Sequence, residues 1–174
     1  AIIIGGLLGV LIYEYKRLAA PVMVMVNFLY TIPSISMLGL LLYVSGVGNT
    51  TAIIALVIYA LLPMVRNTFT GLNQIDKAMC EAGIALGLTR IQRLWNIEIP
   101  LAMPTIMAGI RTMLVMTIAL TGIASFIGAG GLGVAIYRGI TTNQSALTIA
   151  GSLLIALLAI IVDALFSLGE SVTR

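Results

Sequence analysis

A polar, charge-bearing segment from Asn67 to Pro100 interrupts a chain that is otherwise almost continuously apolar. Hydrophobic residues make up 60% of the 174 residues and charged residues only 9%, whereas about a quarter of an ordinary soluble domain is charged. A helix crosses the bilayer core with about 20 consecutive apolar residues, and the apolar stretches approach or reach this length. The sequence therefore predicts an all-α, polytopic membrane protein that forms a single transmembrane domain over residues 1–174.

The apolar stretches predict about five membrane helices. Residues 1–12 cover only roughly 18 Å at about 1.5 Å per residue, so we expect the inner half of a truncated first helix. The other predicted spans are about 21–45, with a kink at Pro33, and about 50–65, 100–123 and 146–166. We expect a Gly-rich turn and then a polar connection through 138–144 before the last span.

The basic residues predict which ends of the spans face the cytoplasm. When the chain is followed from side to side, one face collects Lys16, Arg17, Arg66, Lys77, Arg90, Arg93 and Arg174. Only Arg138 falls on the opposite face, and Arg111 lies inside a span. Because cytoplasmic loops carry the excess of Lys and Arg, the polar segment 67–100 is predicted to be cytoplasmic.

The residue inventory removes most catalytic chemistry. The chain has no His and one Cys, Cys80. It therefore lacks the residues needed for zinc sites, for Ser-His or Cys-His catalysis and for disulfide frameworks. It also lacks a Gly-x-x-x-x-Gly-Lys-Ser/Thr phosphate loop. We therefore expect neither an enzyme nor a metal, cofactor or nucleic-acid site. An intramembrane enzyme and an ATPase-independent channel or carrier are the competing function classes.

Local signals divide the polar segment into two short helices. Asp76 is predicted to cap a helix over 77–86, and Gly87 suits the left-handed position that ends it. Thr89 and Gln92 have the spacing of a capping box for a second helix, over 90–97. Pro100 is suited to the start of the fourth span, where no amide donor is needed. The segment is thus predicted to be a compact helix pair.

A spaced motif runs through this helix pair. It reads Glu81-Ala82-Gly83, three residues, Gly87, nine residues, then Ile97-Glu98-Ile99-Pro100. This pattern resembles the EAA loop of ABC-transporter permeases, with Gly83 in place of the third Ala and Ile99 in place of a Leu. In that family the loop docks into the ATPase. The resemblance implies an ATPase-coupling surface formed by Glu81, Ala82, Gly83, Gly87, Ile97 and Pro100.

Other segments are similar to the osmoprotectant branch of this family, whose permeases carry glycine betaine, carnitine or choline. They are 31–34, 61–68, 108–112 and 126–133. The resemblance implies the type I importer fold in a bacterial cytoplasmic (inner) membrane. It implies an ATPase dimer that handles ATP and Mg²⁺, a second permease subunit (identical or different) and an extracytoplasmic binding protein that mainly selects the substrate. Another betaine-like solute, such as ergothioneine, is the alternative cargo.

A pathway and an ion pair complete the expectations. The predicted pathway or gate residues are Thr31, Pro33, Ser34, Thr117, Ser125, Gly128 and Gly130. The alternatives are an ordinary helix kink at Pro33 and a plain turn at the glycines. Arg111 and Asp163 carry opposite charges at similar depth and are expected to pair, with Glu170 as an alternative partner. Arg111 could instead snorkel to the headgroups or face a water-filled cavity.

Overall fold

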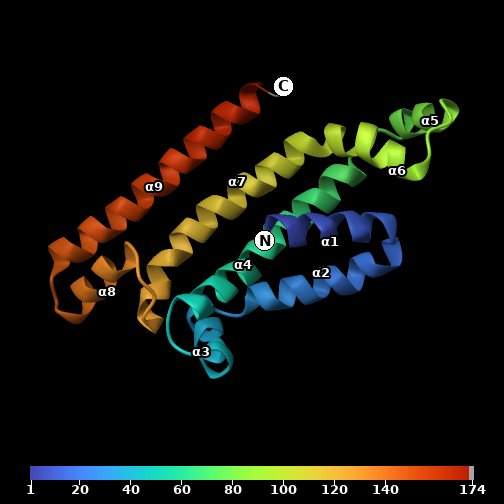
Figure 1. Ribbon diagram of the computed structural model, residues 1–174. Helices are drawn as coiled ribbons and strands as arrows, with labels where there is room; N and C mark the ends of the chain where they lie inside the picture. The colour runs from blue at the N-terminus through green and yellow to red at the C-terminus, as the bar shows by residue number, and fades with distance from the viewer. Residues whose placement is uncertain (173–174) are drawn as a thin grey trace.

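The computed structural model describes the backbone of residues 1–172 and the side chains of residues 1–167, and every regular element in this part of the chain is helical (Figure 1). The elements are α1 (Ile2–Glu14), α2 (Lys16–Thr31), α3 (Ser34–Ser45), α4 (Asn49–Asn73), α5 (Lys77–Ala85), α6 (Arg90–Arg93), the π-helical turn η1 (Leu94–Glu98), α7 (Ile99–Ala124), the 3₁₀ turn η2 (Ser125–Ile127), α8 (Gly133–Thr141) and α9 (Ser145–Val172). The all-α prediction is confirmed.

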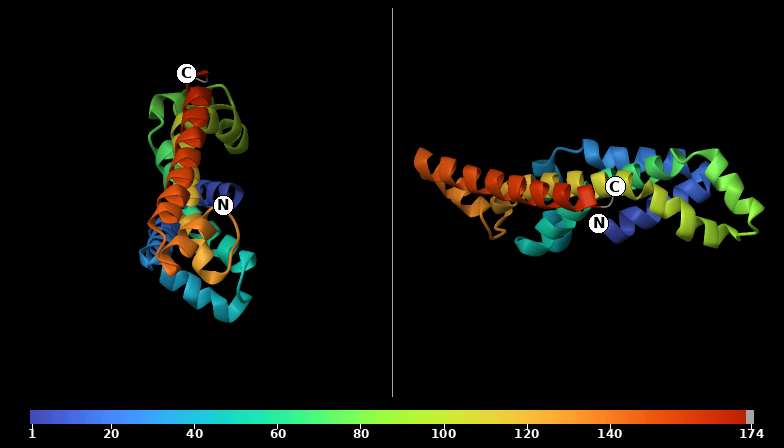
Figure 2. Two further views of the ribbon diagram at one scale, coloured as in Figure 1. Left: turned by 90° about the vertical axis from the view of Figure 1, so that its left-hand side faces the viewer. Right: turned by 90° about the horizontal axis from the view of Figure 1, so that it is seen from above.

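Three helical stretches are long and apolar enough to cross a membrane: 49–73, 90–127 and 145–167. A fourth crossing is possible if the bent pair α2 and α3 counts as one span. In Figure 1, α4, α7 and α9 have roughly parallel axes; α7 lies between the other two and runs antiparallel to them. Figure 2 shows that α5 and α6 lie at one end of the elongated molecule and α8 near the other. This arrangement separates the polar helix pair from the Gly-rich segment.

The predicted second span is broken, not merely kinked. Helices α2 and α3 meet at an angle of 98°, and Ile32 between them is extended at φ −66° and ψ 126°. Pro33 forces this, because a residue before proline avoids the helical region. The Tyr59 hydroxyl of α4 donates a hydrogen bond to the carbonyl of Ile32, which the break leaves without a helical partner.

Three predicted boundaries were wrong. The third span continues past Arg66 to Asn73, so its inner end projects towards the polar segment. The second short helix does not end before the fourth span, because 90–127 is one continuous helical stretch. The stretch predicted as a polar connection is largely the helix α8, whose Gly133 and Gly139 are buried against neighbouring segments. Tertiary packing determines the helix boundaries in all three places.

Two glycines let α1 lie close to α4. Gly5 and Gly9 are buried on α1, and an added Cβ at Gly9 would lie 2.5 Å from the Cβ of Thr68. At Gly5 the added Cβ would lie 2.7 Å from the Cβ of Met64. The spacing of Gly5 and Gly9 therefore makes a packing face for α4, as small residues do between membrane helices.

An ion pair joins α7 to α9 within the apolar region. The Arg111 guanidinium donates two hydrogen bonds to the Asp163 carboxylate, one of them from Nη2 to Oδ2 at 2.5 Å. The two side chains are 34% and 38% exposed within this single chain. Glu170, the alternative partner, lies outside the described side chains. A bidentate guanidinium–carboxylate contact is the strongest form of such a pair.

We predict that Arg111 and Asp163 are energetically coupled. Arg111→Leu or Asp163→Leu leaves one charge unpaired in a span, which costs about 2.5–3.5 kcal/mol on insertion scales. Each single variant should reduce the amount of folded protein extracted from membranes, and the double variant should recover part of the loss. Thr112→Leu, an exposed neighbour on α7, is the control and should change little. Strictly additive losses would contradict the coupling.

Candidate functional site

Helix α5 is closed at both ends by its own sequence. Asp76 accepts a hydrogen bond from the Ala78 amide at 2.9 Å, as predicted for the cap. At the other end Gly87 is left-handed at φ +77°, and Leu88 donates to the carbonyl of Gly83 at 3.1 Å. This is the Schellman arrangement that a C-terminal glycine favours. The turn towards α6 therefore depends on a glycine at position 87.

The next helix starts at the predicted capping box and then changes geometry. Thr89 and Gln92 make the reciprocal contacts of the box at the start of α6. From Leu94 to Glu98 the chain makes a π-helical turn, which ends directly before Ile99 and Pro100. Proline has no amide hydrogen, so the α-helical ladder cannot close on it and the wider turn is accommodated there. Helix α7 then continues without a break.

The motif residues divide into a buried and an exposed set. Gly83 is buried, and a Cβ added there would lie 2.9 Å from Cδ1 of Ile97 and 3.3 Å from Cδ of Arg93. The absence of a side chain lets α5 lie close to η1. Glu81 and Ala82 are exposed on α5, and Gly87 and Pro100 are also exposed. The helix pair thus presents Glu81 and Ala82 on an outer surface and uses Gly83 and Ile97 to hold itself together.

Glu98 is the buried centre of the helix pair. Its side chain is 0% exposed, and its Oε1 accepts hydrogen bonds from Nη1 of Arg90 at 2.6 Å and from Nε of Arg93 at 2.7 Å. The Cys80 sulfur of α5 lies 3.9 Å from the same oxygen. Burial, followed by the Glu98 charge, raises the pKa of the Cys80 thiol. One carboxylate therefore contacts α5, α6 and the start of α7.

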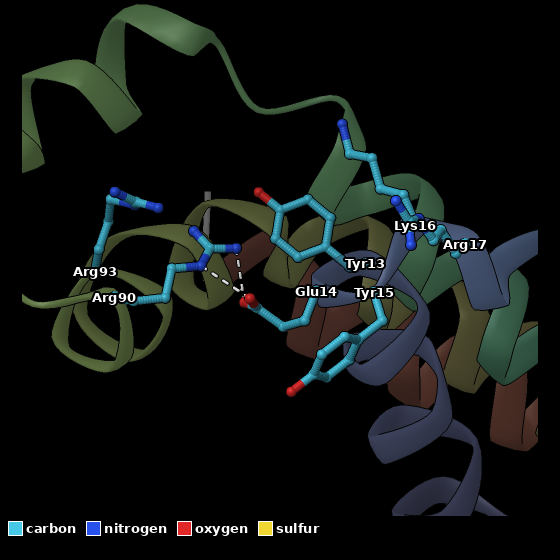
Figure 3. A pocket seen from close by; sticks show the side chains of 7 residues that line it. All are labelled: Tyr13, Glu14, Tyr15, Lys16, Arg17, Arg90 and Arg93. Carbon is cyan, nitrogen blue, oxygen red and sulfur yellow. Dashed lines mark hydrogen bonds and ion pairs between the residues drawn. The ribbon is translucent and has the colours of Figure 1, made fainter.

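Arg90 extends this network to the turn between α1 and α2 (Figure 3). Its Nε donates to Oε2 of Glu14 at 2.9 Å, and its Nη2 lies 2.6 Å from Oε1 of Glu14. The guanidinium carbon also lies 5.4 Å from the centre of the Tyr13 ring. We name the chain of contacts Glu14–Arg90–Glu98–Arg93 the coupling network. It joins the helix pair to the end of α1, at the turn into α2.

The predicted pathway residues do not line one cavity. Thr31 and Pro33 are exposed at the α2–α3 break, and Ser34 borders a cavity of about 10 Å³, room for a single water at most. Thr117 is half-buried beside a separate 260 Å³ pocket. Ser125 is 5% exposed and donates to the Gly122 carbonyl, so it lies inside the protein.

The Gly-rich segment packs near the break. Gly128 is left-handed at φ +78°, and a Cβ there would lie 2.9 Å from Cγ1 of Val47. The amide of Gly130 donates to Oδ1 of Asn49 at 2.9 Å. Ala124, Ile127 and Ala129 share one apolar cluster with residues of α3 and α4, and Ile32 packs against it. Whether this end forms the gate stays a prediction.

Sequence reasoning missed the roles of Glu98 and Glu14. The sequence predicts no role for Glu98 within the motif, yet it is the most buried charge of the described residues. A usable signal existed: a lone acid follows two arginines in a short helical stretch beside a membrane span. Glu14 gave no comparable signal, since its partner is 76 positions away. Aromatic residues that are separated in the sequence also meet in the structure. The ring centres lie 6.0 Å apart for Tyr30 and Tyr59 and 5.2 Å apart for Phe126 and Tyr137.

We predict that Glu98→Ala destabilises the helix pair by about 3–5 kcal/mol, because it leaves Arg93 beside an empty buried position. The change should lower the thermal midpoint of the purified permease, followed by the fluorescence of its single tryptophan, Trp95. Glu81→Ala removes an exposed carboxylate and should stay within about 0.5 kcal/mol of the parent. Equal midpoints for the two variants would show that the buried carboxylate contributes no stability.

Comparison with known proteins agrees with this geometry. The profile of the binding-protein-dependent transport system inner membrane component family matches residues 1–171. The glycine betaine/carnitine/choline transport system permease protein OpuCD of Bacillus subtilis is 47% identical over 164 residues, which are 94% of this chain and 72% of that protein. The osmoprotectant import permease protein OsmW of Salmonella typhimurium is 47% identical over 168 residues, covering 94% of this chain and 78% of OsmW.

A more distant relative joins two functions in one chain. It is the ergothioneine transport permease/ergothioneine binding protein EgtU of Helicobacter pylori, 41% identical over 93% of this chain and 29% of its own length. Among solved structures, an inward-facing MetNI methionine ABC transporter matches with a TM-score of 0.88 at 22% identity, covering 99% of this chain and 87% of that one. The fold is therefore that of a type I ABC importer permease. With its family profile, its relatives and its fold in agreement, the chain belongs to the binding-protein-dependent transport system inner membrane components.

Proposed function

We propose that this chain is the membrane-spanning subunit of an ATP-driven importer for a small osmoprotectant such as glycine betaine, carnitine or choline. The names of OpuCD and OsmW support that substrate class. Ergothioneine is the alternative cargo, supported by the similarity to EgtU. The chain translocates the solute and performs no chemistry itself.

The observation that carries this proposal is the shape of the helix pair. It exposes Glu81 and Ala82 on a short helix that is capped at both ends and braced by the coupling network. We propose that this exposed surface docks on a cytoplasmic ATPase, which binds ATP and Mg²⁺. Because the small Ala82 side chain lets another surface approach closely, a partner could seat against the backbone of α5.

Two helices connect the docking surface to the membrane. The chain enters the helix pair from α4, which ends at Asn73, and leaves it in the continuous stretch 90–127. Movement of α5 by the ATPase would therefore act on α4 and α7 together, and on α1 through Arg90 and Glu14. This motion would alternately open the pathway between two permease subunits, identical or different. An extracytoplasmic binding protein, separate or fused, would deliver the solute near the Gly-rich segment.

The test compares two exposed glycines that both have a positive φ. Gly87 and Gly46 are left-handed at φ +77° and +75°, and no neighbouring atom would lie within 4 Å of an added Cβ at either. Valine at Gly87 costs about 1–2 kcal/mol of backbone strain, and valine at Gly46 is strained at least as much, because ψ −176° at that φ is a region almost exclusive to glycine. Only Gly87→Val disturbs the turn of the helix pair. In proteoliposomes holding the complete transporter, it should lower substrate uptake several-fold and abolish stimulation of ATP hydrolysis by the loaded binding protein.

Gly46→Val is the control for strain alone and should keep uptake coupled to ATP hydrolysis. If Gly87→Val also keeps this coupling, the helix pair is not the docking surface. Uptake of glycine betaine, carnitine, choline and ergothioneine, each measured with its binding protein, then decides the cargo. Uptake without ATPase would instead favour a channel or carrier.

A further inference from the structure

A basic pocket lies beside the coupling network. It has a volume of about 650 Å³ and is lined by Tyr13, Glu14, Tyr15, Lys16, Arg17, Arg90 and Arg93 (Figure 3). We propose that this pocket binds the phosphate group of an anionic membrane lipid. The proposal goes beyond the transport function and does not depend on which solute is carried.

The charge of the pocket favours an anion. Four cations line it, against Glu14 and the buried Glu98 behind it, so the site keeps a net charge of about +2. Both carboxylates are already engaged by Arg90, and Glu98 also by Arg93. Among the described residues no carboxylate lies within ion-pair distance of Lys16 or Arg17. These two exposed cations are therefore available to a ligand.

The position of the pocket favours a lipid as the source of the phosphate. Lys16 and Arg17 stand at the turn between two apolar helices, the depth at which a lipid headgroup lies. Tyr13 and Tyr15 flank them, as aromatic residues do at membrane interfaces. Leu11 and Leu18, 40% and 42% exposed on either side of the turn, offer apolar surface for acyl chains. Basic pockets between membrane helices bind phosphate-bearing headgroups in this way.

A bound headgroup would also neutralise repulsion within the pocket. Lys16 and Arg17 come from α2, whereas Arg90 and Arg93 come from α6. A phosphate between them would join α2 to α6 by charge, next to the Glu14–Arg90 contact that joins α1 to α6. The lipid would thus strengthen the connection between the α1–α2 turn and the helix pair.

The test measures lipid retention directly. The complete transporter is reconstituted with a mixture of phosphatidylglycerol and phosphatidylcholine, and retained lipids are counted by native mass spectrometry. The double variant Lys16→Gln/Arg17→Gln should retain about 30-fold less phosphatidylglycerol, since each cation near an anionic headgroup contributes roughly a fivefold gain. The matched control is Lys77→Gln/Arg138→Gln, which removes two exposed cations outside the pocket and should retain as much as the parent.

Inorganic phosphate and glycerol 3-phosphate are added as competitors, to show whether the bound phosphate group belongs to a lipid or comes from solution. If neither displaces phosphatidylglycerol, the site takes a lipid headgroup, as proposed. If inorganic phosphate binds with the same dependence on Lys16 and Arg17, the phosphate chemistry is upheld and the lipid source is wrong. Equal retention by the two double variants, with no phosphate binding, overturns the proposal. Thermal midpoints in zwitterionic detergent should match for all variants, so that a loss of lipid cannot come from unfolding.

Discussion

The end of the molecule that carries α5 and α6 depends on the buried carboxylate of Glu98. A carboxylate without water is stable only beside compensating charge, and Arg90 and Arg93 supply it from the preceding turns. That requirement fixes where both arginines point. Because Arg90 also reaches Glu14, the same carboxylate indirectly positions the α1–α2 turn. One desolvated charge thereby links the consecutive segments α5, α6 and η1 to α1, which is distant in the sequence.

This arrangement would let the polar segment transmit force, as the proposed docking on an ATPase requires. A loop joined to the membrane by flexible residues would absorb a push from a partner. Here α5 is held by Gly83 packed on Ile97, and the chain then continues as helix from Arg90 to Ile127. Stiffness at one end is combined with a 98° break at the other, where Pro33 separates α2 from α3. The continuous helix and the helix break therefore occupy opposite ends of the bundle.

The features that could be predicted are those that depend on neighbours in the chain. The Asp76 cap, the Thr89 capping box and the left-handed Gly87 need only a few adjacent residues, and all three are confirmed. The burial of Glu98 and its link to Glu14 arise only when distant helices pack. Helix α8 was missed for the same reason, since its two buried glycines acquire meaning only against other segments.

The π-helical turn at 94–98 affects the direction in which the proposed docking surface faces. Each residue of an α-helix advances the chain by about 100° around the axis. The turn holds one residue more than an α-helical turn would, so α6 and α5 are rotated by about that angle relative to α7. Deleting a single residue there would keep the caps at Asp76 and Thr89 but would point Glu81 and Ala82 in a different direction. The direction of the proposed docking surface thus depends on the number of residues between Thr89 and Pro100 as well as on the Glu98 contacts.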